Sequence, residues 1–340
     1  MAKLLIHSTF FKHNLDVISQ HLGTKEKLAI VLKDNAYGHG IKEIASLASE
    51  YGIKTAFVKN EQEALQISQD FEHITALYGE ISPNAPQNIY QSIHSLQALK
   101  TLTPHRKIEL KFNTGMNRNG LEERELREAI DLVLKRDLEL VGVFSHNGYS
   151  DEGGEAMQNQ HQKSQEIKEQ ITHLAKTLGF PLPRFHFLNS SGALRQTEIQ
   201  EDLVRIGIAA YGYLCSPLSI AKDLKPIASL WANQISKRKL AQGEKLGYDG
   251  MGIMPQNGVV STYDLGYGDG LFRLSETHKK LYCANGELIL PRISMDCFSC
   301  LSQEEEICVF KDVKEWAKVF HTIPYEILVK LSPFIQRVVI

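Results

Sequence analysis

The sequence predicts an α/β fold, with an N-terminal (β/α)8 barrel of the TIM type followed by a smaller C-terminal domain rich in β-structure. Two observations lead to this prediction. In the first two thirds of the chain, short apolar runs alternate with longer amphipathic stretches, which is typical of parallel strands joined by helices. From about residue 225 the helical patterns thin out and alternating segments appear. The number of strand-helix units favours a closed eight-stranded barrel over an open sheet, although periodicity alone does not decide between them.

The predicted barrel strands are short apolar runs of about five residues. They lie at residues 28–32, 54–58, 74–78, 107–112, 140–144, 184–188 and 204–208. The predicted helices show apolar residues at helical spacing or dense charge. They lie at residues 41–51, 61–67, 96–102, 122–136 and 155–178. Gly52 ends the first of these helices, and Asn60 caps the second.

The second domain is predicted from segments in which apolar and polar residues alternate. These segments lie at residues 230–235, 259–265, 280–283, 287–293 and 307–310. Pro217 and Pro226 mark the stretch in which the pattern changes. We therefore expect the barrel at residues 1–220 and the β domain at residues 221–340.

Composition narrows the function classes. The 340 residues carry a formal net charge of −2, and no basic run suggests a nucleic-acid or membrane partner. We find no secretion signal and no apolar stretch long enough to span a bilayer, so we expect a cytoplasmic protein. Cys297 and Cys300 have CxxC spacing, but a second such pair is missing, so we expect buried thiols and no metal.

Lys33 is the most informative residue of the chain. It directly follows the apolar run 28–32, where a strand is expected to end and a turn to begin. Apolar walls favour the neutral amine, which can form a Schiff base with a carbonyl cofactor. Gly38 and Gly40 let the backbone turn close to a ligand. For an isolated lysine, a surface position after a strand would be the favoured alternative.

Further polar residues and backbone donors fall at other predicted strand ends, where chemistry gathers in a barrel. They are Arg118, His146, Asn189, Ser190, Arg205, Gly207 and Ile208. Each has an ordinary structural alternative when taken singly, but their shared placement favours a site. The hydroxyl and N–H groups of residues 190–192 and 207–208 suit a phosphate. A phosphate-bearing aldehyde that reacts with a lysine indicates pyridoxal 5'-phosphate.

These residues resemble the alanine racemase family over nearly the whole chain. The matching segments, in order, are KDNAYGHG at 33–40, KFNTGMNR at 111–118, His146, NS at 189–190, RIGI at 205–208, GY at 247–248, LGYGDG at 265–270 and ISMD at 293–296. A single match would be weak evidence, whereas eight in order across two domains are strong evidence.

The resemblance implies a homodimer with shared active sites that supplies D-alanine for peptidoglycan. Lys33 would hold pyridoxal phosphate as an internal aldimine. Tyr37, Ser190, Gly207 and Ile208 would lie near the phosphate, His146 by the ring and Arg205 at the pyridine nitrogen. Asn189 would also belong to the cofactor site. Arg118 and Met295 would contact the substrate, and Tyr248 and Met295 would come from the partner subunit. Lys111 matches a position that is often carbamylated in the family.

Racemisation agrees with this arrangement, because a proton must leave one face of Cα and return to the other, which calls for two bases. By resemblance, Lys33 serves the D-enantiomer and Tyr248 the L-enantiomer. A phenol is a weak acid, so Tyr248 needs nearby positive charge to act as a base. Without the resemblance, Tyr248 would be taken for an aromatic residue in a turn. Arg205 does not readily give up a proton, so it would leave the pyridine nitrogen largely unprotonated.

The chain departs from the family pattern at several positions. Asp34 replaces an alanine, Asn113 an aspartate, Asn119 a leucine, Gly247 a serine and Val339 the penultimate tyrosine. A phenol near the phosphate and the entrance is therefore missing, which could alter substrate range or rate.

Other functions stay open at this point. One is a broad-specificity amino-acid racemase, and another is a decarboxylase of the related barrel class, although those chains are usually longer. A non-catalytic pyridoxal phosphate carrier would have no use for a second domain with Tyr248 and residues 294–296. A metal-binding or structural protein around Cys297 and Cys300 ranks lowest.

Overall fold

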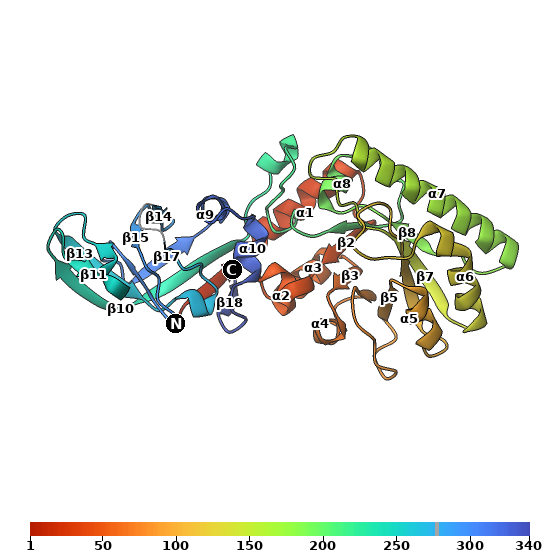
Figure 1. The fold of residues 1–340 in the computed structure, drawn as a ribbon, viewed down its shortest axis with the longest axis horizontal. Coiled ribbons are helices and arrows are strands. Elements are labelled where there is room, and N and C mark those ends of the chain that lie inside the picture. Colours follow the sequence, from red (N-terminus) through yellow and green to blue (C-terminus); the bar gives the residue numbers. More distant parts are fainter. Residues whose placement is uncertain (276–278) are drawn as a thin grey trace. The chain divides into compact units, whose positions relative to one another are not determined.

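The computed structural model describes residues 1–275 and 279–340 (Figure 1). The chain divides into two compact units. The barrel unit comprises Phe11–Asp34 and Ile44–Lys225, and the sheet unit comprises Met1–Phe10, Asn35–Glu43 and Pro226–Ile340. These units are interleaved in sequence, so they do not test a single division of the chain at residue 220, which stays a prediction.

The barrel unit contains an eight-stranded parallel sheet in the order β8-β7-β6-β5-β4-β3-β2-β9. Its strands are β2 (Leu28–Val31), β3 (Thr55–Val58), β4 (His73–Ala76), β5 (Ile89–Ile93), β6 (Lys107–Lys111), β7 (Glu139–Phe144), β8 (Arg184–His186) and β9 (Val204–Ile206). Backbone hydrogen bonds from Arg205 N to Leu188 O (3.1 Å) and from Asp202 N to Phe185 O (3.0 Å) link the two outer strands. The sheet is therefore a nearly closed barrel, which confirms the predicted fold class.

Helices connect most of these strands, and α1 (Ser8–Leu22) and η2 (Ser219–Lys222) lie before the first and after the last of them. The connecting helices are α2 (Lys33–Tyr37), α3 (Ile41–Tyr51), α4 (Glu61–Gln66), α5 (Leu96–Thr101), η1 (Glu123–Glu125), α6 (Leu126–Lys135), α7 (Glu155–Leu178) and α8 (Ser190–Leu194). Asn60 caps α4 as predicted, and its side chain accepts from the backbone N–H of Glu63. The expected helix 122–136 is wrong at its start, because the first turn is the 3₁₀ helix η1, and Glu122 and Glu125 form a capping box there.

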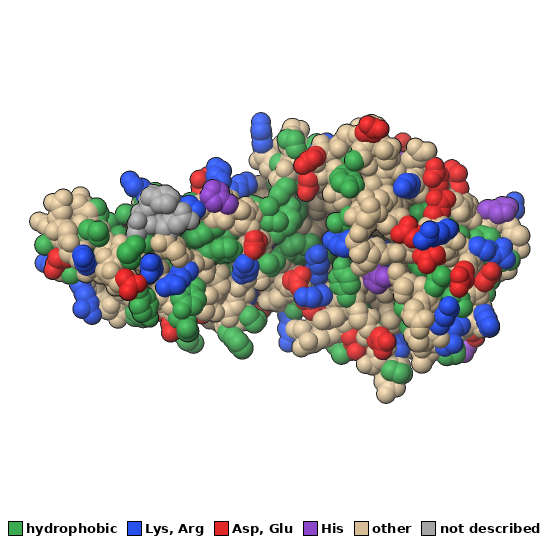
Figure 2. Space-filling view, in the orientation of Figure 1, with side chains coloured by type: hydrophobic (Ala, Val, Ile, Leu, Met, Phe, Trp, Pro, Cys, Tyr) green, Lys and Arg blue, Asp and Glu red, His purple; other side chains and the backbone are tan. Residues whose placement is uncertain are grey.

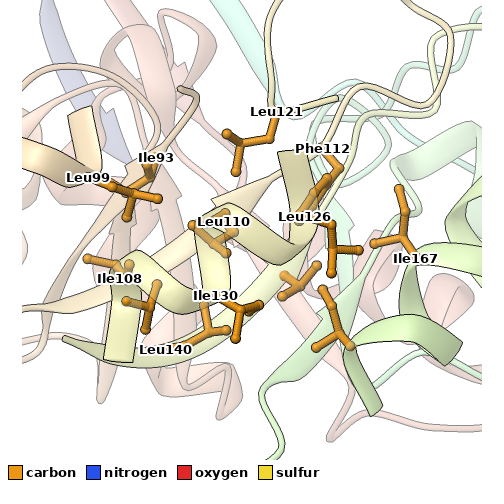
Figure 3. Close-up of a cluster of buried hydrophobic side chains, with 14 of the residues drawn as sticks. Ile93, Leu99, Ile108, Leu110, Phe112, Leu121, Leu126, Ile130, Leu140 and Ile167 are labelled. Atoms are coloured by element: carbon orange, nitrogen blue, oxygen red, sulfur yellow. The ribbon is translucent and has the colours of Figure 1, made fainter. Parts of the chain in front are cut away.

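An apolar layer lies between the barrel wall and its helices (Figure 3). Ile108 and Leu110 of β6 pack with Leu126 and Ile130 of α6, and all four side chains are fully or almost fully buried. Because side chains alternate along a strand, Glu109 and Lys111 point to the opposite face, into the barrel. The packing of β6 therefore places two charged side chains in the barrel interior.

The sheet unit is built around one eight-stranded, mostly antiparallel sheet. Its strands are β1 (Lys3–Ile6), β10 (Ala228–Leu240), β13 (Gly258–Tyr263), β14 (Leu281–Tyr282), β15 (Leu288–Leu290), β16 (Phe298–Cys300), β17 (Glu306–Phe310) and β18 (Gln336–Val339), and a separate pair is formed by β11 (Lys245–Leu246) and β12 (Gly252–Ile253). Its helices are η3 (Tyr248–Gly250), η4 (Tyr267–Asp269), α9 (Lys314–Val319) and α10 (Pro324–Val329). β1 pairs with β10 and with β18.

The surface agrees with the nearly balanced net charge. On the face drawn in Figure 2, acidic and basic side chains are interspersed. In the described part of the chain, no helix combines the length and the apolar character needed to cross a membrane.

Candidate active site

The polar residues predicted from the sequence lie where barrel strands end. Lys33 follows β2, His146 follows β7, and Asn189 and Ser190 follow β8, while Arg205 lies within β9. Because the strands are parallel, their carboxyl ends meet at one rim of the barrel. The barrel thus gathers residues that are far apart in sequence.

The Lys33 amine is half-buried, and burial lowers its pKa below that of an ordinary lysine. Asp34 raises this pKa in part, whereas Arg118 and Lys59 lower it further. Asp34 also accepts a hydrogen bond from Lys59, at 2.8 Å between Nζ and Oδ1. The net effect favours the neutral, nucleophilic amine.

The backbone after Lys33 forms an unusual turn. Residues 34–37 have φ values of 54°, 55°, 51° and 54°, so α2 is a left-handed helical turn, which costs about 1–2 kcal/mol per residue. The Asn35 side chain accepts from the N–H of Ile41 at 2.8 Å and stabilises this turn. Gly38 follows with a φ of 84°, and a Cβ there would lie 2.0 Å from the carbonyl oxygen of Leu328. The sequence predicted a turn at this point but not its handedness.

His146 is a neutral imidazole in a strongly cationic environment. Burial lowers its pKa to about 3, and four nearby cationic groups contribute to that shift. These groups, in order of effect, are Arg205, Arg118, Lys111 and Lys33. This end of the barrel therefore suits a ligand that carries several negative charges.

Lys111 contributes to the same positive potential. Burial, followed by Arg118, Arg205 and Lys33, lowers its pKa to about 8. Its Nζ donates to the side-chain oxygen of Asn119, one of the residues at which the chain departs from the family pattern. Asn119 thus supplies a polar partner for Lys111.

Arg205 is buried, and both of its Nη atoms donate hydrogen bonds within the barrel. Its Nη2 donates to the backbone carbonyls of Ser145 (2.6 Å) and Phe187 (3.4 Å). Its Nη1 donates to Nδ1 of His186 at 2.6 Å and also to the carbonyl of His186. Burial lowers the pKa of Arg205 to about 10, so the guanidinium still carries its charge at neutral pH.

Ser190 and Asn189 are held by the backbone around α8. The N–H of Gly207 donates to Ser190 Oγ at 3.0 Å, which leaves the hydroxyl proton available to an outside acceptor. Asn189 Oδ1 accepts from the N–H of Gly192 at 2.9 Å, and its Nδ2 donates to the carbonyl of Asn147 at 2.9 Å. Both side chains are therefore fixed by hydrogen bonds.

Together these groups fit the cofactor that the sequence indicates. The Lys33 amine, whose pKa is lowered, can react with an aldehyde. The neutral imidazole of His146 can lie beside an aromatic ring, and the cationic end of the barrel can bind a phosphate. Among the described residues, no cluster of three or more His, Cys, Asp or Glu side chains could hold a metal ion.

The remaining predicted residues lie in the sheet unit. Tyr37 contacts the ring of Tyr325 edge to face, with centroids 6.4 Å apart. Tyr248 begins η3 and is 59% exposed, and Met295 is 53% exposed. The neighbouring Asp249 accepts from Arg292 at 2.7 Å, which anchors the loop that carries Tyr248.

The LGYGDG segment positions Met295. The N–H of Tyr267 donates to Ser294 O (3.0 Å), and the N–H of Gly268 donates to Met295 O (2.8 Å). A Cβ at Gly266 would lie 2.1 Å from the carbonyl oxygen of Met295, so only glycine permits this approach. The glycines of the segment thus have a packing role next to a predicted substrate residue.

Sequence reasoning missed two buried residues beside Arg205, namely His186 and Glu109. Both side chains are 0% exposed, and His186 touches Arg205 directly. Strand β6 (KIELK) alternates charged and apolar residues, and in a barrel strand that is buried on both faces the charge of Glu109 was a usable signal, since a buried carboxylate needs partners.

The fold and the site define a class of proteins that join a parallel barrel, with a lysine after an early barrel strand, to a second unit rich in β-structure. Residues 6–215 match the family model for the alanine racemase N-terminal domain, and residues 227–339 match that for the C-terminal domain. The chain therefore belongs to the alanine racemase family and is an enzyme of the racemase class.

Curated relatives and solved structures agree with this assignment. The alanine racemase of Campylobacter concisus is 42% identical over 337 residues, which are 99% of each chain, and that of Campylobacter jejuni strain 81-176 is 38% identical over 100% of each chain. The solved alanine racemase of Clostridium difficile has a TM-score of 0.86 at 23% identity and covers 100% of this chain and 95% of its own. A Bartonella henselae alanine racemase solved with covalently bound pyridoxal phosphate has a TM-score of 0.79 at 23% identity, covering 100% of this chain and 99% of its own. These structures support the fold.

Proposed function

We propose that this chain interconverts L-alanine and D-alanine with pyridoxal 5'-phosphate held on Lys33, in the cytoplasm, and supplies D-alanine for peptidoglycan. The observation that carries the proposal is Lys33, a half-buried lysine at the cationic rim of the barrel. Burial lowers its pKa, and the barrel matches the family model. The 42% identity to a curated alanine racemase over 99% of each chain supports alanine as the substrate.

The residues that would hold the cofactor are those that the barrel gathers. Tyr37, Ser190, Gly207 and Ile208 would surround the phosphate, His146 would lie beside the ring, and Arg205 would face the pyridine nitrogen. Asn189 would also belong to the cofactor site. When bound, pyridoxal phosphate withdraws electrons from Cα of the amino acid and so weakens its Cα–H bond.

Two bases on this chain would move the proton. Lys33 Nζ takes or returns the proton on the face that yields the D-enantiomer, and Tyr248 Oη serves the opposite face. The lowered pKa of Lys33 supports its part, because the neutral amine is the form that accepts a proton.

The other side chains would bind and orient. The Arg118 guanidinium would hold the substrate carboxylate. Met295 would limit the space for the substrate side chain to about the size of a methyl group. The Arg205 charge, which persists at neutral pH, would keep a proton off the pyridine nitrogen and so limit transamination.

We further propose a homodimer in which Tyr248 and Met295 act in the partner's site. Both side chains are more than half exposed in the single chain, as a residue that reaches into a second subunit would be. The hydrogen bonds that fix their loops support this role, because a residue shared between subunits needs a defined position.

One experiment tests the core of this proposal. The purified protein is reconstituted with pyridoxal phosphate, its absorbance is recorded, and borohydride is added to trap the Schiff base for peptide mapping. We expect the label on Lys33, and we expect the circular dichroism of L-alanine to decay with the wild type but not with Tyr248→Phe. A colourless protein, or a label on another lysine, would refute it.

Serine and lysine are assayed beside alanine in the same experiment. Comparable rates on all three would favour a broad-specificity racemase, and a labelled protein that leaves the optical signal constant would favour a cofactor carrier.

A further inference from the structure

Glu109 is a fully buried carboxylate whose two oxygens have different partners. Oε1 accepts from Nε of Arg184 at 3.0 Å and from Nη2 of the same residue at 2.5 Å. Oε2 lies 3.2 Å from Nε2 of His186. Within residues 1–275 and 279–340, both atoms are buried and neither makes a hydrogen bond of strict geometry, so each is the nearest polar partner of the other. Each of the two buried polar atoms therefore depends on the other as its hydrogen-bonding partner.

His186 in turn touches the guanidinium of Arg205. Nη1 of Arg205 lies 2.6 Å from Nδ1 of His186. A guanidinium can only donate, so Nδ1 must accept. Burial lowers the pKa of His186 to about 4, so the ring is neutral at pH 7 and carries one proton. That proton must then sit on Nε2, where it faces the carboxylate of Glu109.

The charge state of Glu109 agrees with this arrangement. Burial raises the pKa of its carboxyl, but Arg184 and His186 lower it by more, so the group is ionised at neutral pH. An ionised carboxylate only accepts hydrogen bonds, which matches the two Arg184 donors at Oε1 and the close Nε2 of His186 at Oε2.

The barrel has a gap shaped for this side chain. Glu109 of β6 is level with Gly142 of β7, which is level with Arg184 of β8. A Cβ on Gly142 would lie 2.7 Å from Oε1 of Glu109. The missing side chain on the middle strand thus lets the carboxylate cross β7 and reach β8.

Aromatic rings fix the plane of His186. Phe144 stacks on it at 10° with centroids 5.1 Å apart, and Phe57 lies 5.1 Å away at a tilt. The same two rings lie under the guanidinium of Arg205, at 5.3 Å and 5.8 Å from its carbon. The stacking therefore holds the imidazole in the plane in which Nδ1 faces Arg205 and Nε2 faces Glu109.

We propose that Glu109 is a positioning residue of this enzyme, whose carboxylate holds His186 in the Nε2–H tautomer and thereby fixes the orientation of Arg205. The link to catalysis rests on the proposed role of Arg205 toward the cofactor ring. The hydrogen-bond relay itself does not depend on that role, since it lies entirely within the barrel unit.

The first test measures the tautomer directly. The cofactor-free protein is labelled with ¹⁵N-histidine, and the ring nitrogens are observed by two-bond ¹H–¹⁵N correlation, with His186→Gln used for assignment. We expect Nδ1 of His186 without a proton and Nε2 with one. A proton on Nδ1 in the wild type would overturn the proposal, and this result needs no variant to fold and no racemase activity.

The second test removes the carboxylate charge with Glu109→Gln, which keeps the shape. Glu201→Gln is the matched control, because Glu201 is also buried and raises the pKa of Arg205 but, in the described part of the chain, forms no hydrogen bond to His186. We expect the His186 signals to change in Glu109→Gln and not in Glu201→Gln. We also expect kcat to fall by about tenfold or more while KM for alanine changes little.

Unchanged ring signals in Glu109→Gln, or an equal effect in both variants, would refute the relay. A changed tautomer without a change in kcat would show that the relay exists but does not position Arg205 for the reaction, and the proposal would fail in that part. Neither result bears on whether the protein racemises alanine.

Discussion

Arg337 donates a hydrogen bond from Nη2 to the backbone carbonyl of Gly38, 2.8 Å away. Its Nη1 donates to Ser332 O (2.7 Å) and Ile335 O (2.5 Å). Strand β18 thus holds the segment that continues from Lys33 through the left-handed turn.

Arg337→Lys should lower the stability of the sheet unit, because an ammonium cannot serve three carbonyls in this fixed geometry. We expect a loss of about 1–3 kcal/mol in the free energy of unfolding, measured by urea denaturation. Arg238→Lys, on the exposed part of β10, is the control and should change little. Equal stability of the two variants would show that the Gly38 contact contributes nothing.

Asp34→Asn and Lys59→Met should shift the pH dependence of Schiff-base formation in opposite directions. Asp34 raises the pKa of Lys33, so its neutralisation should lower that pKa and extend trapping to lower pH. Lys59 lowers the pKa of Lys33, so its removal should raise that pKa and confine trapping to higher pH. The measurement is borohydride-trapped cofactor against pH.

Both groups are partly exposed, so the two shifts should shrink in high salt. Shifts of the same sign in both variants would contradict the electrostatic account of Lys33.

Lys33→Ala and Tyr248→Phe should complement each other if the proposed dimer shares its sites. Each variant alone should be inactive, since each lacks one base in both sites. After unfolding and refolding as an equal mixture, half of the dimers are mixed and contain one intact site, so about a quarter of wild-type activity should return. A mixture that stays inactive would place both bases on one chain.

Gly266→Ala should disrupt the Met295 segment, because the added Cβ would lie 2.1 Å from a backbone oxygen. We expect a loss of about 1–3 kcal/mol in stability and a higher KM for alanine. Gly258→Ala is the matched control, since its Cβ would meet only Met254 Cε, at 3.8 Å. Thermal unfolding and steady-state kinetics on both variants check this, and similar behaviour of the two would count against it.

Much of the barrel could be predicted from the sequence because its strands are buried on both faces and its helices are strongly amphipathic. The predicted helix at residues 155–178 agrees with α7 residue for residue. Strand β5 escaped detection because residues 77–88, all of them described, contain no helix to separate it from β4. Strands β1 and β18 escaped because each is four residues long and gains stability only from partners far away in sequence.

The site was predictable where chemistry is tied to strand ends, as for Lys33 and His146. Its supporting residues were harder to find, since the importance of Glu109 depends on a glycine on the neighbouring strand and an imidazole two strands away. The left-handed turn at residues 34–37 carries only half of a local signal, because Asp34 and Asn35 tolerate positive φ but Ala36 and Tyr37 do not favour it. The role of each site residue toward cofactor and substrate stays a prediction.

Strand β1 has a consequence for biosynthesis. Leu4 and Ile6 are fully buried, yet their strand partners lie at Ala228–Trp231 and Gln336–Val339. A nascent chain therefore carries an apolar strand without its neighbours while more than two hundred later residues are made, whereas most of the barrel can already condense. Ribosome-bound intermediates of this protein should expose that strand to chaperones until translation has nearly finished.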